Sequence, residues 1–413
     1  MSFEAAVQYL FSLGHETLTM KLGLRNTELL LNALDNPQRA FRSVQIAGTN
    51  GKGSTAAMLD SICRAAGIKC GLYTSPHLVS ITERIRVAGE AIPPEEFAAC
   101  ATTVRDVSEQ LLRDKQIEAL PTFFEQLTAI ALYAFRNAEI ELAILETGLG
   151  GRLDSTTAAN AHIVAITQIA MDHEEYLGDT IESIASEKAA IIRPGVAAVL
   201  AKQQPEAMAV LLQRCKETGV VPILADERGY EDVRIGLRGR HQIDNAAVAV
   251  RVAELLRIPR SAIVSGLENV QHPGRLELIE HKPPFLLDGA HNPAGCRSLL
   301  EYLDEFSTRP LTLVFGAMRD KQLDQIGEIL FPVAGVLVLT PVENPRSASI
   351  EMLRSIANRY ARGIVIETSS SAEALQVAIA RTPPSGLICI AGSLYLIGEM
   401  RPSILRMRLE EPT

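Results

Sequence analysis

The strongest chemical signal in the sequence is the glycine-rich segment GTNGKGST at residues 48–55. It follows an apolar run that is typical of a buried strand and opens a run with helical periodicity. Glycines let backbone N–H groups approach phosphate oxygens, a lysine adds positive charge, and a hydroxyl at a helix start can face Mg²⁺. Lys52 and either Ser54 or Thr55 supply these groups. The segment predicts a nucleoside triphosphate site, and a tight turn without ligand is the alternative.

Two further polar side chains stand where apolar runs end. Glu146 follows the run 142–145 and leads into a glycine-rich loop, and His173 comes after the run 162–167, directly behind Asp172. Open parallel sheets place ligands beyond the carboxyl ends of their strands, so both side chains are candidates for holding Mg²⁺. The alternatives are a salt-bridged strand end for Glu146 and a structural role for His173.

A lysine and a serine complete the candidates. Lys188 stands in the helical run 181–191, one turn from Ile184 and Ile191, which predicts a position near the core-facing edge of the helix. The alternative is a lysine without a functional role, whose aliphatic part packs on the core while its amine reaches solvent. Ser75 opens a Ser-Pro-His turn after the run 69–73, and such a segment is by itself more often only a turn.

Taken in order, these segments resemble the Mur ligase superfamily, and the Gly-Lys-Gly-Ser ending of the phosphate loop is similar to its folylpolyglutamate synthase and dihydrofolate synthase branch. The resemblance covers nearly the whole chain and implies a role for each of several residues. The implied ATP-binding residues are Thr49, Asn50, Gly51, Lys52, Gly53, Ser54, Thr55, Asn245, Arg275, Asp288 and His291. The implied metal ligands are Ser54, Ser75, Glu146, His173 and Lys188. The implied substrate contacts are Glu83, Arg84, Asp154 and Thr156, and the implied catalytic residues are Lys52, His173 and Lys188.

Three segments in the second half carry the rest of this resemblance, namely HQIDN at 241–245, PGR at 273–275 and DGAHNP at 288–293. A capping turn before a helix also explains the last segment, and both interpretations can hold together. For Glu83 and Arg84 the alternative is a solvated surface pair. The chain departs from the family pattern at 154–157, where it reads DSTT and the family commonly has DATN.

The resemblance implies an ATP-dependent carbon–nitrogen ligase that joins L-glutamate to dihydropteroate, to (tetrahydro)folate polyglutamate, or to both, through an acyl phosphate. It also implies ATP, two Mg²⁺ ions, a carbamylated Lys188 and a monovalent cation as cofactors. Two rival functions remain open from the sequence. One is another amino-acid ligase of the same superfamily, and the other is a nucleotide-binding regulatory module that hydrolyses ATP slowly.

The elements that must position these residues predict an α/β protein with two domains. Strand-like runs at 43–47, 69–73, 142–145, 162–167, 196–200 and 220–224 alternate with helical runs such as 95–113 and 123–136. A second series follows at 285–288, 311–315, 336–340, 363–366 and 387–391. Prolines and a glycine interrupt the chain at 272–283. The family resemblance implies a P-loop NTPase-like domain with the ATP site and a folate pocket at 1–276. It implies a smaller Rossmann-like domain at 277–413 that binds glutamate and contacts the nucleotide.

Composition restricts the class of protein. The 413 residues are 47% hydrophobic and 22% charged, which is typical of a globular protein with a large core. A net charge of -9 without a basic tract argues against nucleic acid as a partner. The six cysteines form no CxxC pair, so we expect buried, reduced thiols. No apolar stretch of about 18 residues and no signal-peptide order occur, so we expect a cytoplasmic protein without a membrane partner. We also expect a monomer, although no pattern in the sequence bears on the oligomeric state.

Overall fold

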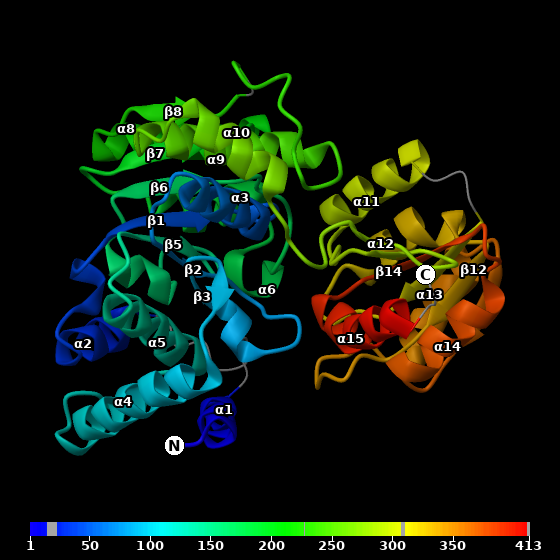
Figure 1. Cartoon of the computed structure of the whole chain (residues 1–413), viewed down its shortest axis with the longest axis horizontal. Helices are drawn as coiled ribbons and strands as arrows, with labels where there is room; N and C mark the ends of the chain where they lie inside the picture. Colours follow the sequence, from blue (N-terminus) through cyan, green and yellow to red (C-terminus); the bar gives the residue numbers. More distant parts are fainter. Residues whose placement is uncertain (15–22, 227, 307–309, 411–413) are drawn as a thin grey trace. The chain divides into compact units, whose positions relative to one another are not determined.

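The structure is a computed structural model that describes residues 1–14, 23–226, 228–306 and 310–410, and it divides into two compact units (Figure 1). The first unit is Met1–Ile169, Asp179–Gly236 and Ile243–Val270, and the second is Ala170–Gly178, Leu237–Gln242 and Gln271–Thr413. The expected domains 1–276 and 277–413 are continuous, whereas two short segments inside the first range, Ala170–Gly178 and Leu237–Gln242, belong to the second compact unit.

Among the described residues of the first unit, eight strands form one sheet in the order β4-β3-β2-β5-β1-β6-β7-β8. The bounds are β1 Arg42–Ala47, β2 Cys70–Tyr73, β3 Ile85–Val87, β4 Glu90–Ala91, β5 Leu142–Glu146, β6 Ile163–Ile166, β7 Ala197–Leu200 and β8 Pro222–Leu224. The strands from β2 to β8 in this order pair in parallel, while β3 and β4 add an antiparallel edge. The carboxyl ends of β2, β5, β1 and β6 therefore lie at the same edge of the sheet.

Helices pack on this sheet and on one another. Their bounds are α1 Phe3–Ser12, α2 Arg25–Ala33, α3 Lys52–Ala65, α4 Pro94–Arg113, α5 Phe123–Asn137, α7 Ile181–Ala189, α8 Pro205–Thr218, α9 His241–Leu255 and α10 Arg260–Asn269. Helix α3 contacts β1, β2, β5 and α10, and α5 contacts β2 and α4. All five residues of β5 are buried, as expected for a parallel strand whose two faces are covered.

The second unit has its own sheet and core. Its described strands, β9 Glu277–Ile279, β10 Phe285–Leu287, β11 Leu311–Phe315, β12 Val336–Leu339, β13 Ile364–Glu367 and β14 Leu387–Ala391, have the order β13-β12-β11-β14-β10-β9. Only the edge strand β9 is antiparallel among them. Its helices are α6 Glu174–Leu177, α11 Pro293–Phe306, α12 Leu323–Leu330, α13 Ile350–Tyr360, α14 Ser371–Arg381 and α15 Leu394–Glu410. Helix α12 contacts α11 and α13, while α14 contacts α15, β11 and β12.

The predicted α/β class is confirmed, with a mostly parallel sheet in each unit. The prediction of buried, unpaired cysteines is also confirmed for all six. Within the described ranges, no helix combines the length and apolar character needed to span a membrane.

Candidate active site

The phosphate loop lies between the carboxyl end of β1 and the first turn of α3. Gly48 has φ 150° and Gly51 has φ 87°, a region that glycine enters far more readily than residues with a Cβ atom. The backbone N–H groups of Thr49 and Asn50 donate to the carbonyl of Gln168, at 2.8 and 3.1 Å. The loop is therefore held against the segment that follows β6.

Helix α3 begins at Lys52, so Ser54 and Thr55 both stand in its first turn. Lys52 Nζ donates back to the carbonyls of Gly48 and Thr49, at 3.0 and 3.1 Å. Its positive charge thus lies over the loop, beside the positive end of the α3 dipole, which is a suitable environment for an anion.

Close approach of other side chains explains why both loop positions carry glycine. A Cβ atom at Gly48 would stand 1.9 Å from Thr167 Oγ1, and one at Gly51 would stand 2.0 Å from Asn245 Oδ1. Thr55 Oγ1 also donates to the backbone carbonyl of Asn245, at 3.4 Å. The predicted ATP-binding residue Asn245, in α9, therefore lies directly at the phosphate loop.

Glu146 and Ser75 meet because β5 and β2 are parallel neighbours, with Tyr73 in register with Leu145. Glu146 is only 5% exposed, and its Oε2 accepts a hydrogen bond from the backbone N–H of Ser75 at 3.2 Å. A carboxylate and a hydroxyl-bearing residue at one sheet edge are oxygen donors of the kind that Mg²⁺ prefers. Across the described ranges, no three or more His, Cys, Asp and Glu gather as a metal site, and Mg²⁺ ordinarily keeps waters and substrate oxygens among its ligands.

Lys188 in α7 is buried, with 4% of its surface exposed, and its Nζ donates to the carbonyl of Gly48 at 2.9 Å. The core-facing position expected from the spacing is confirmed. Two lysines, Lys188 and Lys52, therefore bring their amines to the same carbonyl oxygen of the phosphate loop.

Asp154 and Thr156 are buried in the loop that follows β5. Asp154 accepts hydrogen bonds from the N–H of Leu149 at 2.9 Å, from the N–H of Thr156 at 3.0 Å, and from the Thr156 hydroxyl. Burial raises the pKa of the Asp154 carboxyl, and these hydrogen bonds act against the increase. Both residues thus stabilise the loop itself, and their contact with substrate stays a prediction.

Glu83 and Arg84 also make internal contacts. The Glu83 carboxylate accepts hydrogen bonds from the backbone N–H groups of residues 78–80. Arg84 is 2% exposed, its Nε donates to His77 Nδ1 at 2.8 Å, and its guanidinium lies 5.5 Å from the ring centroid of Phe123. The alternative of a solvated surface pair is therefore wrong for Arg84. The partnership with His77 was not anticipated from the sequence.

In the second unit, the predicted segment 288–293 follows β10. Asp288 accepts hydrogen bonds from the N–H groups of Leu276 and Ala290, both at 2.9 Å. Burial raises the pKa of the Asp288 carboxyl, and the positive charge of Arg275 opposes that increase. A Cβ atom at Gly289 would stand 2.7 Å from Arg275 Nη1, so the predicted ATP-binding arginine lies against this segment.

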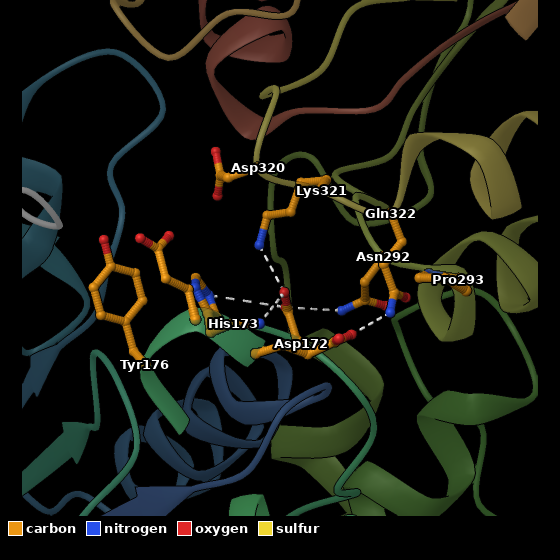
Figure 2. Close-up of a pocket in the computed structure, with 10 residues that line it drawn as sticks. Asp172, His173, Tyr176, Asn292, Pro293, Asp320, Lys321 and Gln322 are labelled. Carbon is orange, nitrogen blue, oxygen red and sulfur yellow. Dashed lines mark hydrogen bonds and ion pairs between the residues drawn. The ribbon is translucent and has the colours of Figure 1, made fainter. Parts of the chain in front are cut away.

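Asp172 is the centre of a polar cluster in the second unit (Figure 2). Its carboxylate accepts from Lys321 Nζ at 2.7 Å and Asn292 Nδ2 at 3.1 Å, and Nε2 of His291 and His173 lie 3.7 and 3.9 Å away. Burial alone would raise the pKa of Asp172, but the nearby imidazole of His291 and the positive charges of His173 and Lys321 hold it well below its usual range.

This cluster extends the sequence interpretation, in which Asp172 is only the residue before the candidate ligand His173. The backbone N–H of His173 donates to Asp172 at 2.9 Å. The side-chain hydrogen bonds to the carboxylate come from Lys321 and Asn292, for which the sequence motifs imply no role. Both follow parallel strands, β11 and β10, and that position was the available signal. Asn292 also accepts from Gly295 N–H at 2.8 Å and thus caps α11, which begins at Pro293.

The predicted residues are divided between the units. The first unit holds Thr49, Asn50, Gly51, Lys52, Gly53, Ser54, Thr55, Ser75, Glu83, Arg84, Glu146, Asp154, Thr156, Lys188 and Asn245. The second unit holds His173, Arg275, Asp288 and His291. The expected metal ligand His173 is thus assigned to a different unit from Ser54, Ser75, Glu146 and Lys188.

Comparisons with known proteins agree with these features. Residues 46–221 match the Mur ligase middle domain, and residues 274–394 match the Mur ligase glutamate ligase domain. The dihydrofolate synthase/folylpolyglutamate synthase of Bacillus subtilis is 34% identical over 94% of this chain and 96% of its own length. A probable bifunctional folylpolyglutamate synthase/dihydropteroate synthase of Haloferax volcanii is 36% identical over 98% of this chain, which spans 51% of that protein.

Solved structures of folylpolyglutamate synthases are also similar to this chain. Folylpolyglutamate synthase of Mycobacterium tuberculosis, complexed with ADP and AMPPCP, superposes with a TM-score of 0.90 at 31% identity, over 100% of both chains. A bifunctional folylpolyglutamate synthase/dihydrofolate synthase with Mn, AMPPNP and L-glutamate bound has a TM-score of 0.86 at 28% identity, over 98% of both chains. The resemblance inferred from the sequence motifs is confirmed.

Proposed function

The chain belongs to the dihydrofolate synthase/folylpolyglutamate synthase family of Mur ligases, and from this premise we propose that it joins L-glutamate to dihydropteroate, to (tetrahydro)folate polyglutamate, or to both. The substrate carboxylate takes the γ-phosphoryl group of ATP, which releases ADP and leaves an acyl phosphate. The glutamate amine then attacks the activated carbonyl carbon, phosphate leaves, the amine loses a proton, and an amide remains. No covalent bond to the protein is required.

The observation that carries this proposal is the convergence of Lys52 Nζ and Lys188 Nζ on the Gly48 carbonyl, at 3.0 and 2.9 Å. A glycine-rich loop at a helix start with the Lys52 ammonium over it suits the phosphates of a nucleotide. Lys188 reaches the same carbonyl, where a carbamate on its amine would supply oxygen atoms for Mg²⁺ instead of a second positive charge. Lys52 would offset negative charge on the phosphoryl group during its transfer. Oxygen-bearing Glu146, Ser75 and Ser54 stand at this loop or at the neighbouring strand end and would hold Mg²⁺, which lowers the repulsion between phosphate and carboxylate oxygens.

The second unit would supply the remaining groups. Arg275 and His291 would contact the nucleotide, with Asp288 fixing the backbone between them through Leu276 and Ala290. His173 would be the ligand of a second Mg²⁺. Substrate contacts from Glu83, Arg84, Asp154 and Thr156 would be partly indirect, because all four already stabilise the loops in which they lie.

Carbamylation of Lys188 and a monovalent cation belong to the same proposal, as do a monomeric state and a cytoplasmic location. A carbamate on Lys188 would place a carboxylate-like anion beside the phosphate loop. Labelling with ¹³C-bicarbonate tests it directly: a carbamate carbon resonance in the wild-type protein that disappears in Lys188→Gln supports the modification. Identical spectra for the two proteins would refute it.

The activity itself is tested by ADP release from purified protein with Mg-ATP and glutamate, in the presence of dihydropteroate, tetrahydrofolate or no acceptor. Mass spectrometry of the product identifies the new amide. We expect release that depends on both glutamate and a pterin substrate, and a loss of at least about a hundredfold in Lys52→Met. ATP turnover that neither dihydropteroate nor tetrahydrofolate stimulates would refute the proposal and favour another Mur ligase. ATP turnover that forms no amide would favour a regulatory module.

A further inference from the structure

Gln45 is a buried side chain of β1 that has no part in the mechanism above. It lies on the strand that leads into the phosphate loop and is fully shielded from solvent. Its Nε2 donates to Thr157 Oγ1 at 2.7 Å and to Thr156 Oγ1 at 3.0 Å, with a longer contact of 3.5 Å to Thr147 Oγ1 at the end of β5. A single amide of β1 thus reaches two hydroxyls of the loop that follows β5.

The direction of these hydrogen bonds is fixed by the other bonds of the two hydroxyls. Thr157 Oγ1 donates its proton to the carbonyl of Gly151 at 2.7 Å, and Thr156 Oγ1 donates its proton to Asp154. A hydroxyl has one proton, so both oxygens can only accept from position 45. The site therefore requires a side chain that donates two hydrogen bonds, and a carboxylate of the same shape would present acceptors to acceptors.

The contacts continue from this loop to Lys188 and return to the phosphate loop. The N–H of Arg152, next to Gly151, donates to the carbonyl of Glu187 in α7 at 2.9 Å. A Cβ atom at Gly151 would stand 2.8 Å from that carbonyl and 3.2 Å from Lys188 Cα, so the loop lies directly on α7. Lys188 then donates to the Gly48 carbonyl. A closed ring of contacts thus joins β1, the loop after β5, helix α7 and the phosphate loop.

We propose that Gln45 is a positioning residue that sets Lys188 relative to the phosphate loop by holding the 148–157 loop through Thr156 and Thr157. The kinetic consequence rests on the proposed ligase function, whereas the positioning itself does not.

The amide oxygen of Gln45, Oε1, shows why this role differs from ordinary core packing. Among the described residues, Gln45 Oε1 is buried and has no hydrogen-bond partner. A buried acceptor left unsatisfied lowers stability, which offsets part of what the two donated bonds contribute. Gln45→Met, which removes both donor and acceptor at similar volume, should therefore change global stability little while it releases the loop.

The experiment compares wild type with Gln45→Met, Gln45→Glu, Thr157→Val and Thr157→Ser, and uses Ser43→Ala as the matched control. Ser43 is a buried residue of the same strand whose hydroxyl has no hydrogen-bond partner among the described residues. Hydrogen–deuterium exchange of the 148–157 amides is measured on the nucleotide-free protein, together with thermal unfolding. The value of kcat and the Kd of Mg-AMPPNP are measured on the same preparations.

For Gln45→Met and Thr157→Val we expect about tenfold faster exchange at 148–157 and a kcat lower by about ten- to a hundredfold, with the Kd of Mg-AMPPNP changed by less than about threefold. Gln45→Glu should speed exchange and lower kcat at least as much. Thr157→Ser, which keeps the hydroxyl, and Ser43→Ala should have the exchange rates and kcat of wild type. The double variant Gln45→Met/Thr157→Val should be no worse than either single one, because both break the same connection.

Two results would overturn the inference. One is unchanged exchange at 148–157 in a folded Gln45→Met protein, and the other is a kcat that falls equally in Ser43→Ala. Failure of the proposed function looks different, because wild type would then show no pterin-dependent ADP release while the exchange data still decide the role of Gln45.

Discussion

Replacement of Gly51 by alanine separates the effect of backbone conformation from the effect of close packing at the phosphate loop. Gly51 precedes α3 with φ 87°, and Gly67 follows the same helix with φ 75°. A Cβ atom at Gly51 would stand 2.0 Å from Asn245 Oδ1 and 2.8 Å from its Cγ, whereas nothing lies within 4 Å of a Cβ atom at Gly67. Gly67→Ala is therefore a matched control that shares the unfavourable φ and lacks the collision.

The expected magnitudes follow from these two terms. Alanine at a positive φ costs about 1 to 2 kcal/mol at either position. Asn245 is buried and its carbonyl accepts from Thr55, so it cannot move away freely, and overpacking at Gly51 adds about 1 to 3 kcal/mol. We therefore expect Gly51→Ala to lower the free energy of unfolding by about 2 to 5 kcal/mol and Gly67→Ala by about 1 to 2 kcal/mol.

Urea unfolding measures the stability of each variant, and isothermal titration with Mg-AMPPNP measures nucleotide affinity. Displacement of the loop should weaken binding at least about tenfold in Gly51→Ala, which corresponds to about 1.4 kcal/mol, and leave Gly67→Ala unchanged. Gly51→Ala/Asn245→Ala should recover much of the lost stability because the collision is removed. Equal stability losses in the two single variants, or normal nucleotide binding by Gly51→Ala, would refute this account of the loop.

Three further predictions concern other parts of the chain. Gly266→Ala should lower the free energy of unfolding by about 2 to 3 kcal/mol in urea titrations, because the new Cβ atom would stand 2.4 Å from Ile62 Cα and force α10 away from α3; a loss below that of Gly67→Ala would contradict it. Lys321→Met should lower the free energy of unfolding by about 2 to 3 kcal/mol, because it leaves the Asp172 charge buried with weaker partners, and adding Asp172→Asn should restore part of this loss. If the stability losses of the two single variants simply add in the double variant, the pairing is contradicted. Hydrogen bonds from Arg228 and Arg251 lower the pKa of Asp226 to about 2. This carboxylate therefore contributes stability above its ordinary pKa of about 4, and the contribution disappears as the pH falls through about 2. Asp226→Asn should lessen the loss of stability between these pH values, and an unchanged pH profile would show that the contacts of Asp226 with the two arginines contribute nothing.

The sequence predicted the parallel strands of both sheets but not their antiparallel edges. Continuous apolar runs such as 142–145 and 311–315 can be recognised as strands in the sequence, because a strand that is covered on both faces is apolar throughout. The edge strands β3, β4 and β9 have two or three residues each, and β4 is exposed. Such short segments carry no periodicity, and their strand conformation depends on pairing with a neighbour.

The same distinction applies to the candidate site. Glu146, Lys52 and Lys188 could be selected because each follows a recognisable strand or lies on a recognisable helix. The partnership of Lys321 with Asp172 joins residues 149 positions apart, and that of Gln45 with Thr157 joins residues 112 positions apart. The position of Lys321 after a parallel strand marks it at most as a candidate site residue, and Gln45 carries no local signal, so only the fold identifies the partner in either case.

The two glycine-rich loops show how one pattern can have two physical causes. Gly48 and Gly51 need glycine partly for their positive φ, which leaves the loop the shape that the predicted phosphate site requires. Gly151 has no such φ, and its missing Cβ instead lets the backbone approach α7. Glycines beyond a strand end can indicate close approach to a substrate or metal, but the approach at Gly151 is to the helix that carries Lys188. A side chain there would therefore move Lys188 rather than block a ligand directly.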